Sequence, residues 1–147
     1  MAFFKSIKGR ALGLGATGNL VARGIDVTAP CVDATITVAA EITNVRAITI
    51  QLKDAMGNDI AYSEIVELFV FADVGKLATA TGGSTGIAIG TDGNLQSTVV
   101  AKTHFVLTSE ADGDIDLTWT DTGTEEVALG LRLPTGRVVM TAAFANT

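Results

Sequence analysis

From residue 34 onward, the sequence alternates apolar and polar residues in short runs that are separated by turns rich in Gly, Asp and Asn. In the run Ile115-Asp116-Leu117-Thr118-Trp119, for example, every second residue is apolar. A period of two sends successive side chains to opposite sides of an extended strand, so one side can be buried while the other meets water. Segments such as Thr91-Asp92-Gly93-Asn94 supply the turns, because Gly and Asn reach positive φ at little cost. The pattern predicts an all-β fold, a sandwich of two sheets, with no long amphipathic helix.

The alternating runs set the strands that we expect in this sandwich. They cover residues 34–43, 46–53, 60–62, 65–72, 87–90, 96–101, 103–109, 114–120, 126–133 and 137–144. The stretch from Gly75 to Gly93 is rich in Thr, Gly and Ala, which predicts a long surface loop with a short strand inside it. Trp119 alternates with Leu117 and Ile115, so we expect its ring in the core and not on a ligand-stacking platform.

Charge is distributed unevenly along the chain. The net charge is −6 over 147 residues, but residues 1–30 hold four basic side chains against Asp26 alone, a net of +3, which leaves −9 for the remainder. A basic leading segment on an acidic body indicates that the two parts face different surroundings. The acidic body argues against a nucleic-acid partner, because binding phosphates needs clustered Lys and Arg.

The first 30 residues are predicted to form a separate N-terminal arm, followed by the sandwich domain over residues 31–147. Two short β-like runs, at residues 10–15 and 20–23, flank a turn at residues 16–19, so the arm reads as a hairpin or an extended segment. Two strands bury too little surface to be stable alone in water, so we expect the arm to be ordered on a partner or on the body.

No membrane segment and no secretory signal are predicted. Lys5 follows the opening Met-Ala-Phe-Phe at once, and no apolar run of signal-peptide or membrane-spanning length occurs. We therefore expect a protein that is made in the cytoplasm, stays soluble and has no membrane partner.

Two segments resemble ligand-binding motifs in their letters. Gly13-Leu14-Gly15-Ala16-Thr17-Gly18 matches the dinucleotide fingerprint, but a second β-like run follows it where the fingerprint needs a helix, so we expect no cofactor. The segment Glu110–Asp116 concentrates four carboxylates, which either wrap a calcium ion or form an exposed Asp-Gly hairpin loop joining residues 103–109 to 115–119. The EF-hand pattern fails there because no flanking helices are predicted, and the turn is the favoured interpretation.

The residues that could carry catalysis stand apart from one another. His104, the only histidine, lies in an alternating run and is interpreted as a strand-face residue, with no second histidine to share a metal. Cys31, the only cysteine, has apolar neighbours and is interpreted as an inert, partly buried thiol. Tyr62 follows a turn and is read as an ordinary surface residue. Asp and Glu stand mainly in turns and do not converge, so we expect no enzyme, no catalytic residue and no metal site.

Four segments in order resemble a known group of proteins. Thr49–Asp59, Phe69–Asp73, Ser109–Thr124 and Leu131–Arg137 look like the immunoglobulin-like structural proteins of tailed bacteriophages, and most of all like head decoration (capsid cement) proteins. The resemblance covers about residues 34–145. It implies a single immunoglobulin-like β-sandwich and a role on the virion, with many copies on the outer surface of the head, often as homotrimers. It brings no catalytic residues with it.

This resemblance implies two partners, the major capsid protein and the chain itself. We expect the arm to make the contact, with aromatic anchors and cations that bind the capsid or a sister subunit: Phe3, Phe4, Lys5, Lys8, Arg10 and Arg23. Two alternatives stay open, since immunoglobulin-like phage domains also occur in tails and necks, and a surface module of this fold could bind glycans. Residues 74–96 contain no aromatic residue, which argues against glycan binding through that loop.

Overall fold

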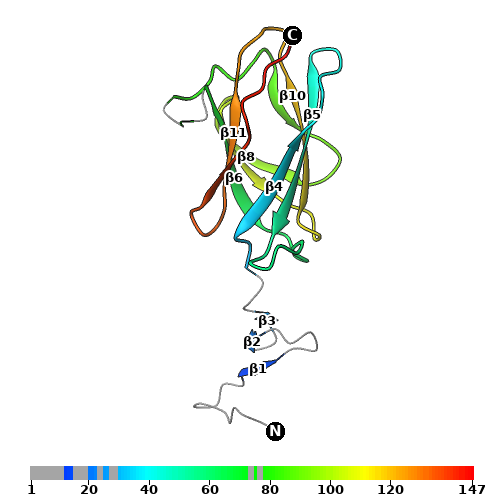
Figure 1. Cartoon of the computed structure of the whole chain (residues 1–147), viewed down its shortest axis with the longest axis vertical. Coiled ribbons are helices and arrows are strands. Elements are labelled where there is room, and N and C mark those ends of the chain that lie inside the picture. Colours follow the sequence, from blue (N-terminus) through cyan, green and yellow to red (C-terminus); the bar gives the residue numbers. More distant parts are fainter. Residues whose placement is uncertain (1–11, 15–19, 23–24, 27–29, 73–74, 76–77) are drawn as a thin grey trace.

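The structure is a computed structural model that describes residues 12–14, 20–22, 25–26, 30–72, 75 and 78–147. Two antiparallel sheets pack against each other and form the body of the protein (Figure 1). The four-stranded sheet has the order β4 (Asp33–Val38), β5 (Val45–Lys53), β10 (Asp114–Thr120) and β7 (Gly86–Ile89). The five-stranded sheet has the order β12 (Val138–Met140), β11 (Ala128–Arg132), β6 (Ile65–Phe71), β9 (His104–Thr108) and β8 (Asn94–Val100). The predicted all-β sandwich is confirmed.

The strand neighbours in the two sheets can be compared with those of the variable-type immunoglobulin arrangement. The sheet β4-β5-β10-β7 occupies the positions A-B-E-D, and β12-β11-β6-β9-β8 occupies G-F-C-C′-C″ of the variable-type arrangement. The order along the chain differs from that arrangement between β6 and β10: after β6 the chain first fills position D with β7 and then returns for β8 and β9. The return route makes β8 the outer strand and places β9 beside β6.

The core lies between the sheets and is built from the apolar side of each strand. From the four-stranded sheet, Ile48, Ile50 and Leu117 have no more than 2% of their surface exposed, and Leu68 and Leu131 face them from the other sheet with none exposed. Trp119 is fully buried, as predicted, and its ring meets Phe144 edge-on with centroids 6.3 Å apart.

Gly83 makes room for the buried indole of Trp119. A Cβ atom at Gly83 would lie 2.9 Å from two ring carbons, and the backbone there has a φ of +68°. Only glycine has no Cβ atom to collide with the ring and also adopts this positive φ without strain. The buried indole therefore requires glycine at this position of the loop.

Three predicted strands differ from the structure. Residues 60–62 form no strand: the contact with the end of β5 is limited to the bridge between Lys53 and Asp59 and to the Ile60 amide, which donates to the Leu52 carbonyl oxygen at 3.2 Å. The side chain of Ile60 lies in the core. The strand expected at 34–43 ends at Val38, before a turn in which Thr43 and Asn44 have positive φ. The strand expected at 137–144 ends at Met140, with one further bridge between Val127 and Phe144. The other seven begin and end within two residues of the prediction.

The N-terminal segment contains a third, small antiparallel sheet. β1 (Leu12–Leu14) pairs with β2 (Leu20–Ala22), and β2 pairs with β3 (Ile25–Asp26). The hairpin-like pairing agrees with the prediction, whereas β3 was not expected. Figure 1 shows these strands outside the sandwich, beyond the end at which β4 begins. Within the described ranges, no helix has the length and hydropathy that crossing a bilayer would require.

Candidate interaction surfaces

The residues predicted to bind a partner lie outside the described part of the chain. These are the aromatic and basic residues of the arm: Phe3, Phe4, Lys5, Lys8, Arg10 and Arg23. Their role therefore stays a prediction. The described residues offer three further surfaces, each of which is built by different strands: a hollow beside β4, a group of aspartates on β10, and the outer face of the five-stranded sheet.

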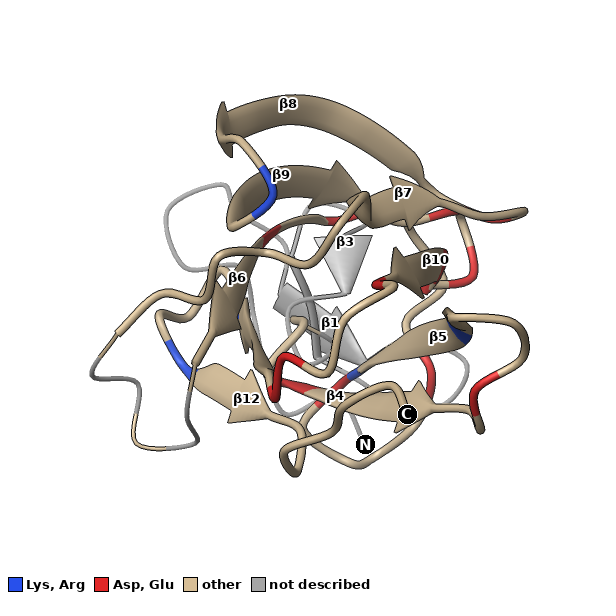
Figure 2. Ribbon diagram, turned by 90° about the horizontal axis from the view of Figure 1, so that it is seen from above, with Lys and Arg blue, Asp and Glu red and all other residues tan. Residues whose placement is uncertain are grey.

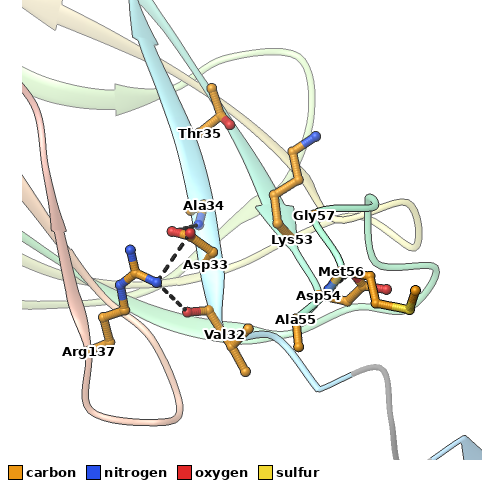
Figure 3. A pocket seen from close by; sticks show the side chains of 10 residues that line it. All are labelled: Val32, Asp33, Ala34, Thr35, Lys53, Asp54, Ala55, Met56, Gly57 and Arg137. Atoms are coloured by element: carbon orange, nitrogen blue, oxygen red, sulfur yellow. Dashed lines mark hydrogen bonds and ion pairs between the residues drawn. The ribbon is translucent and has the colours of Figure 1, made fainter.

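The first surface is a hollow of about 510 Å³ at the start of β4, beside the point where the N-terminal segment joins the sandwich (Figure 3). Arg137 closes one side, with Nη1 3.2 Å from Asp33 Oδ2 and 3.4 Å from the carbonyl oxygen of Val32. On the other side, the Asp54 carboxylate accepts hydrogen bonds from the turn that presents Met56, whose surface is 76% exposed. The hollow therefore combines an ion pair with an exposed apolar side chain.

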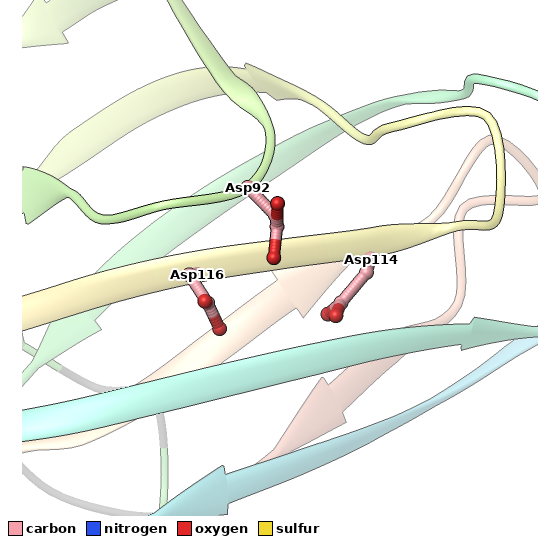
Figure 4. A group of neighbouring side chains, drawn as sticks. All are labelled: Asp92, Asp114 and Asp116. Atoms are coloured by element: carbon pink, nitrogen blue, oxygen red, sulfur yellow. The ribbon is translucent and has the colours of Figure 1, made fainter.

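The second surface is a group of three carboxylates on the outer side of the four-stranded sheet. Oxygen atoms of Asp92, Asp114 and Asp116 lie within 4.8 Å of one another (Figure 4). Thr49 Oγ1 donates a hydrogen bond to Asp116 Oδ1 at 3.1 Å, while Asp114 Oδ1 is buried without a partner. Carboxylate oxygens are ligands that calcium uses, but acidic groups also gather at surfaces without an ion.

The structure corrects how the segment Glu110–Asp116 was interpreted. A turn forms, with the Gly113 amide donating to the Glu110 carbonyl oxygen at 3.1 Å and a φ of +83° at Gly113. However, the turn does not close a hairpin: β9 pairs with β6 and β8, whereas β10 pairs with β5 and β7. The chain crosses here from one sheet to the other, because the apolar sides of β9 and β10 face each other across the core. Only Asp114 and Asp116 of the four carboxylates join the group, and Asp92 comes from the loop after β7.

We expect Asp114→Asn to raise thermal stability at pH 7. Burial raises the pKa of Asp114, and the charges of Asp116, Asp92 and Asp112 raise it further. An acid whose pKa is raised in the folded state adds stability below its unfolded pKa and loses that contribution as the pH rises through the folded value. Removing the charge should therefore stabilise by a few tenths to about 1 kcal/mol at neutral pH. Thermal melts at pH 7 and pH 3 check this; an equal gain at both pH values would contradict it.

The third surface is the outer face of the five-stranded sheet, where aromatic rings lie in a row. The ring centroids of Phe71 and Phe69 are 5.8 Å apart, and those of Phe69 and His104 are 4.2 Å apart, with both pairs stacked. Glu67 lies beside them and contacts two basic side chains: its Oε2 is 3.1 Å from His104 Nε2, and its Oε1 is 3.5 Å from Arg132 Nη2. His104 is a strand-face residue, as expected, but it belongs to an aromatic row that the sequence interpretation missed.

The signal for this surface was present in β6. Its sequence, Ile-Val-Glu-Leu-Phe-Val-Phe, is apolar at both alternating positions except at Glu67. A strand that is apolar on both sides indicates that both sides are covered, as in sheets buried between two layers. In contrast, β10 alternates Asp and Thr with Ile, Leu and Trp, so only its inner side is apolar.

Cys31 and Tyr62 are joined by a hydrogen bond just before the start of β4. Cys31 is 1% exposed, and its amide donates a hydrogen bond to the Tyr62 hydroxyl oxygen at 2.8 Å. Burial, together with the charge of Glu64, raises the pKa of the Cys31 thiol to about 11. A thiol with this pKa forms little thiolate at neutral pH, which agrees with the inert thiol predicted from the sequence.

The three surfaces share one chemical property: they present groups for contact. The hollow holds an ion pair, the aspartates repel one another, and the histidine is engaged with Glu67 and Phe69. No family model and no curated protein sequence matches the chain.

Proposed function

We propose that this chain is a structural protein of a tailed bacteriophage virion, a decoration protein that binds the outside of the head and stabilises it, and that it is not an enzyme. The observation that carries the proposal is the combination of an acidic two-sheet β-sandwich with a basic leading segment. The segments from Thr49 to Arg137 that resemble head decoration proteins support it, since they occupy strands and turns of one sandwich.

In this proposal the arm attaches the sandwich to its partner. Phe3 and Phe4 supply apolar anchors, and Lys5, Lys8 and Arg10 supply charge that selects register and speeds encounter. An arm that orders on binding loses conformational entropy at that moment, but it can span the seam between two capsid subunits. The partner is the major capsid protein or a sister copy.

The acidic body would then face the solvent around the virion. Its net charge of −9, which is the total of −6 less the +3 of residues 1–30, keeps neighbouring copies soluble at high local density. If copies associate as trimers, several weak contacts act together, so that modest single interfaces can hold a shell.

The arm can be tested in the intact chain by reversing its charges. We expect a variant carrying Lys5→Glu, Lys8→Glu and Arg10→Glu to lose most of its cosedimentation with phage heads, by a factor of about ten or more, because each cation faces a complementary charge in the complex. Lys102→Glu is the control, since it reverses an exposed cation of the sandwich, on the loop between β8 and β9 and outside the hollow beside β4. Deletion of residues 2–24 should have the same effect as the triple reversal. Full binding by the charge-reversed variant would contradict the role of the arm.

Binding to separated phage particles distinguishes a role on the head from a role in the tail. Tail-less heads should bind the chain as well as complete virions do, whereas isolated tails should not. Binding to tails alone would instead place the protein in the tail or neck.

A further inference from the structure

The outer face of the five-stranded sheet has the character of an interface and not of a solvated surface. We call it the aromatic face and define it by the outward residues of β6, β9, β11 and β12: Glu67, Phe69, Phe71, His104, Val106, Arg132, Val138 and Met140. The opposite outer face of the sandwich presents Thr49, Asp116 and Thr118 at the corresponding central positions. A solvated outer face is expected to be polar, as that opposite face is. The aromatic face is more apolar, and its apolar side chains are half-buried.

Packing around Gly130 makes the aromatic face flat. A Cβ atom at Gly130 would lie 2.6 Å from Phe71 Cε2 and 2.9 Å from Met140 Sδ, so both side chains lie down over the glycine backbone. The stacked row of Phe71, Phe69 and His104 continues this layer across β6 and β9. Rings held flat by their neighbours lose little further rotamer freedom on contact, which favours association.

A notch interrupts the flat layer at the end of the face where β6 begins. It has a volume of about 120 Å³ and is lined by apolar side chains beside the ion pair of Glu67 and Arg132: Ile65, Val106, Leu133 and Pro134. Ile65 is 57% exposed at its rim. A small notch that combines apolar side chains with a charged pair can receive an anchor side chain from a partner.

Charge decides what the aromatic face binds. Glu67 and Arg132 lie side by side on it, and β8 and β9 carry no acidic or basic residue apart from His104, whereas acidic positions mark the loops around β7 and β10 (Figure 2). The acidic bodies of two copies repel each other overall, and this repulsion is weakest at a face on which the charges balance, as they do here. Because it holds one acid and one base, it is also complementary to itself: Arg132 of one copy can pair with Glu67 of another.

We propose that the aromatic face binds the aromatic face of a second copy of this chain. The inference does not depend on the proposed role in the virion, because it concerns the purified chain alone. The flat area of the face follows from four strand spacings of about 4.8 Å and a strand length of roughly 20 Å, which give roughly 400 Å². Stable interfaces bury roughly 800 Å² of accessible surface on each side, so this contact belongs to the weak class, with a Kd in the micromolar range or above.

Analytical ultracentrifugation of the full chain tests this inference. Between about 10 µM and 1 mM, the wild-type mass should rise from that of one chain toward that of two. Phe69→Lys and Val106→Lys should each weaken association at least about tenfold, because each buries a charge in the contact. Thr118→Lys, at the centre of the opposite outer face, adds the same charge and should leave association unchanged.

Exchanging the charges of Glu67 and Arg132 provides a second, independent test of the contact. Arg132→Glu should weaken association, because Glu67 and the introduced glutamate of one copy would then face the same two acids of the other copy. Adding Glu67→Arg to this variant should restore association, because each acid again faces a base. Circular dichroism confirms that each variant is folded, and Val106→Lys decides the outcome if Phe69→Lys does not fold. A wild-type chain that stays monomeric throughout, or Val106→Lys associating like the wild type, or Thr118→Lys weakening association equally, would overturn the proposal.

Discussion

Replacing Trp119 by Ala should lower the free energy of unfolding by about 3 to 5 kcal/mol. The indole is fully buried, it packs edge-on against Phe144, and Gly83 approaches it as no other residue could. The substitution removes the largest side chain of the core and leaves a cavity that the flanking strands cannot close, because β10 is paired on both sides. Urea denaturation followed by circular dichroism measures the change.

Trp119→Phe is the matched control for this effect. The Trp119 Nε1 atom is buried and has no hydrogen-bond partner, so phenylalanine gives up ring area but no hydrogen bond. We therefore expect Trp119→Phe to lower the free energy of unfolding by about 1 to 2 kcal/mol, well below the effect of alanine. Equal losses in the two variants would show that the indole nitrogen does have a structural partner.

Replacing Asp121 by Ala should be the second most damaging change, with a loss of about 2 to 4 kcal/mol. Asp121 is 4% exposed, and its carboxylate accepts hydrogen bonds from the amides of Ser84 at 2.9 Å, Gly123 at 3.0 Å and Glu125 at 3.3 Å. These amides belong to two loops that are far apart in the sequence. Alanine would leave all three donors without their acceptor at once.

Two other variants isolate the contribution of the Asp121 carboxylate. Asp121→Asn keeps one oxygen acceptor, so it should lose clearly less stability than alanine. Glu126→Ala removes an exposed carboxylate five residues further along and should change stability by no more than about 0.5 kcal/mol. Chemical denaturation of the three variants under one set of conditions provides the comparison. An Asp121→Ala protein as stable as the Glu126→Ala protein would contradict the role of this carboxylate.

Alternation of apolar and polar residues was sufficient to predict most of the fold. It placed β10 at residues 114–120, as observed, and it identified Trp119 as a core residue, because a period of two is a local property of an extended chain. The alternation pattern does not predict the structure where the pairing of distant segments decides whether a strand forms and which strand lies beside it. Residues 60–62 alternate like a strand, yet pairing with β5 stops at the Asp59 bridge and the Ile60 amide. The turn at Asp112-Gly113 joins two sheets instead of two paired strands.

The surfaces were harder to predict than the fold. Phe69 and Arg132 are 63 positions apart in the sequence, and His104 lies between them. Only the pairing of β6 with β9 and β11 brings the three residues onto one face. Similarly, Asp92 joins Asp114 and Asp116 because the loop after β7 returns beside β10. What the sequence did contain was the unusual apolar composition of β6 on both of its sides, which points to a covered outer face.

The most direct test of the virion role is a cryo-EM reconstruction of the phage particle to which the chain belongs. We expect density for the immunoglobulin-like sandwich on the outer surface of the head, with the basic N-terminal segment directed toward the capsid. A particle in which the sandwich is found only in the tail, or from which the chain is missing altogether, would contradict the proposed role.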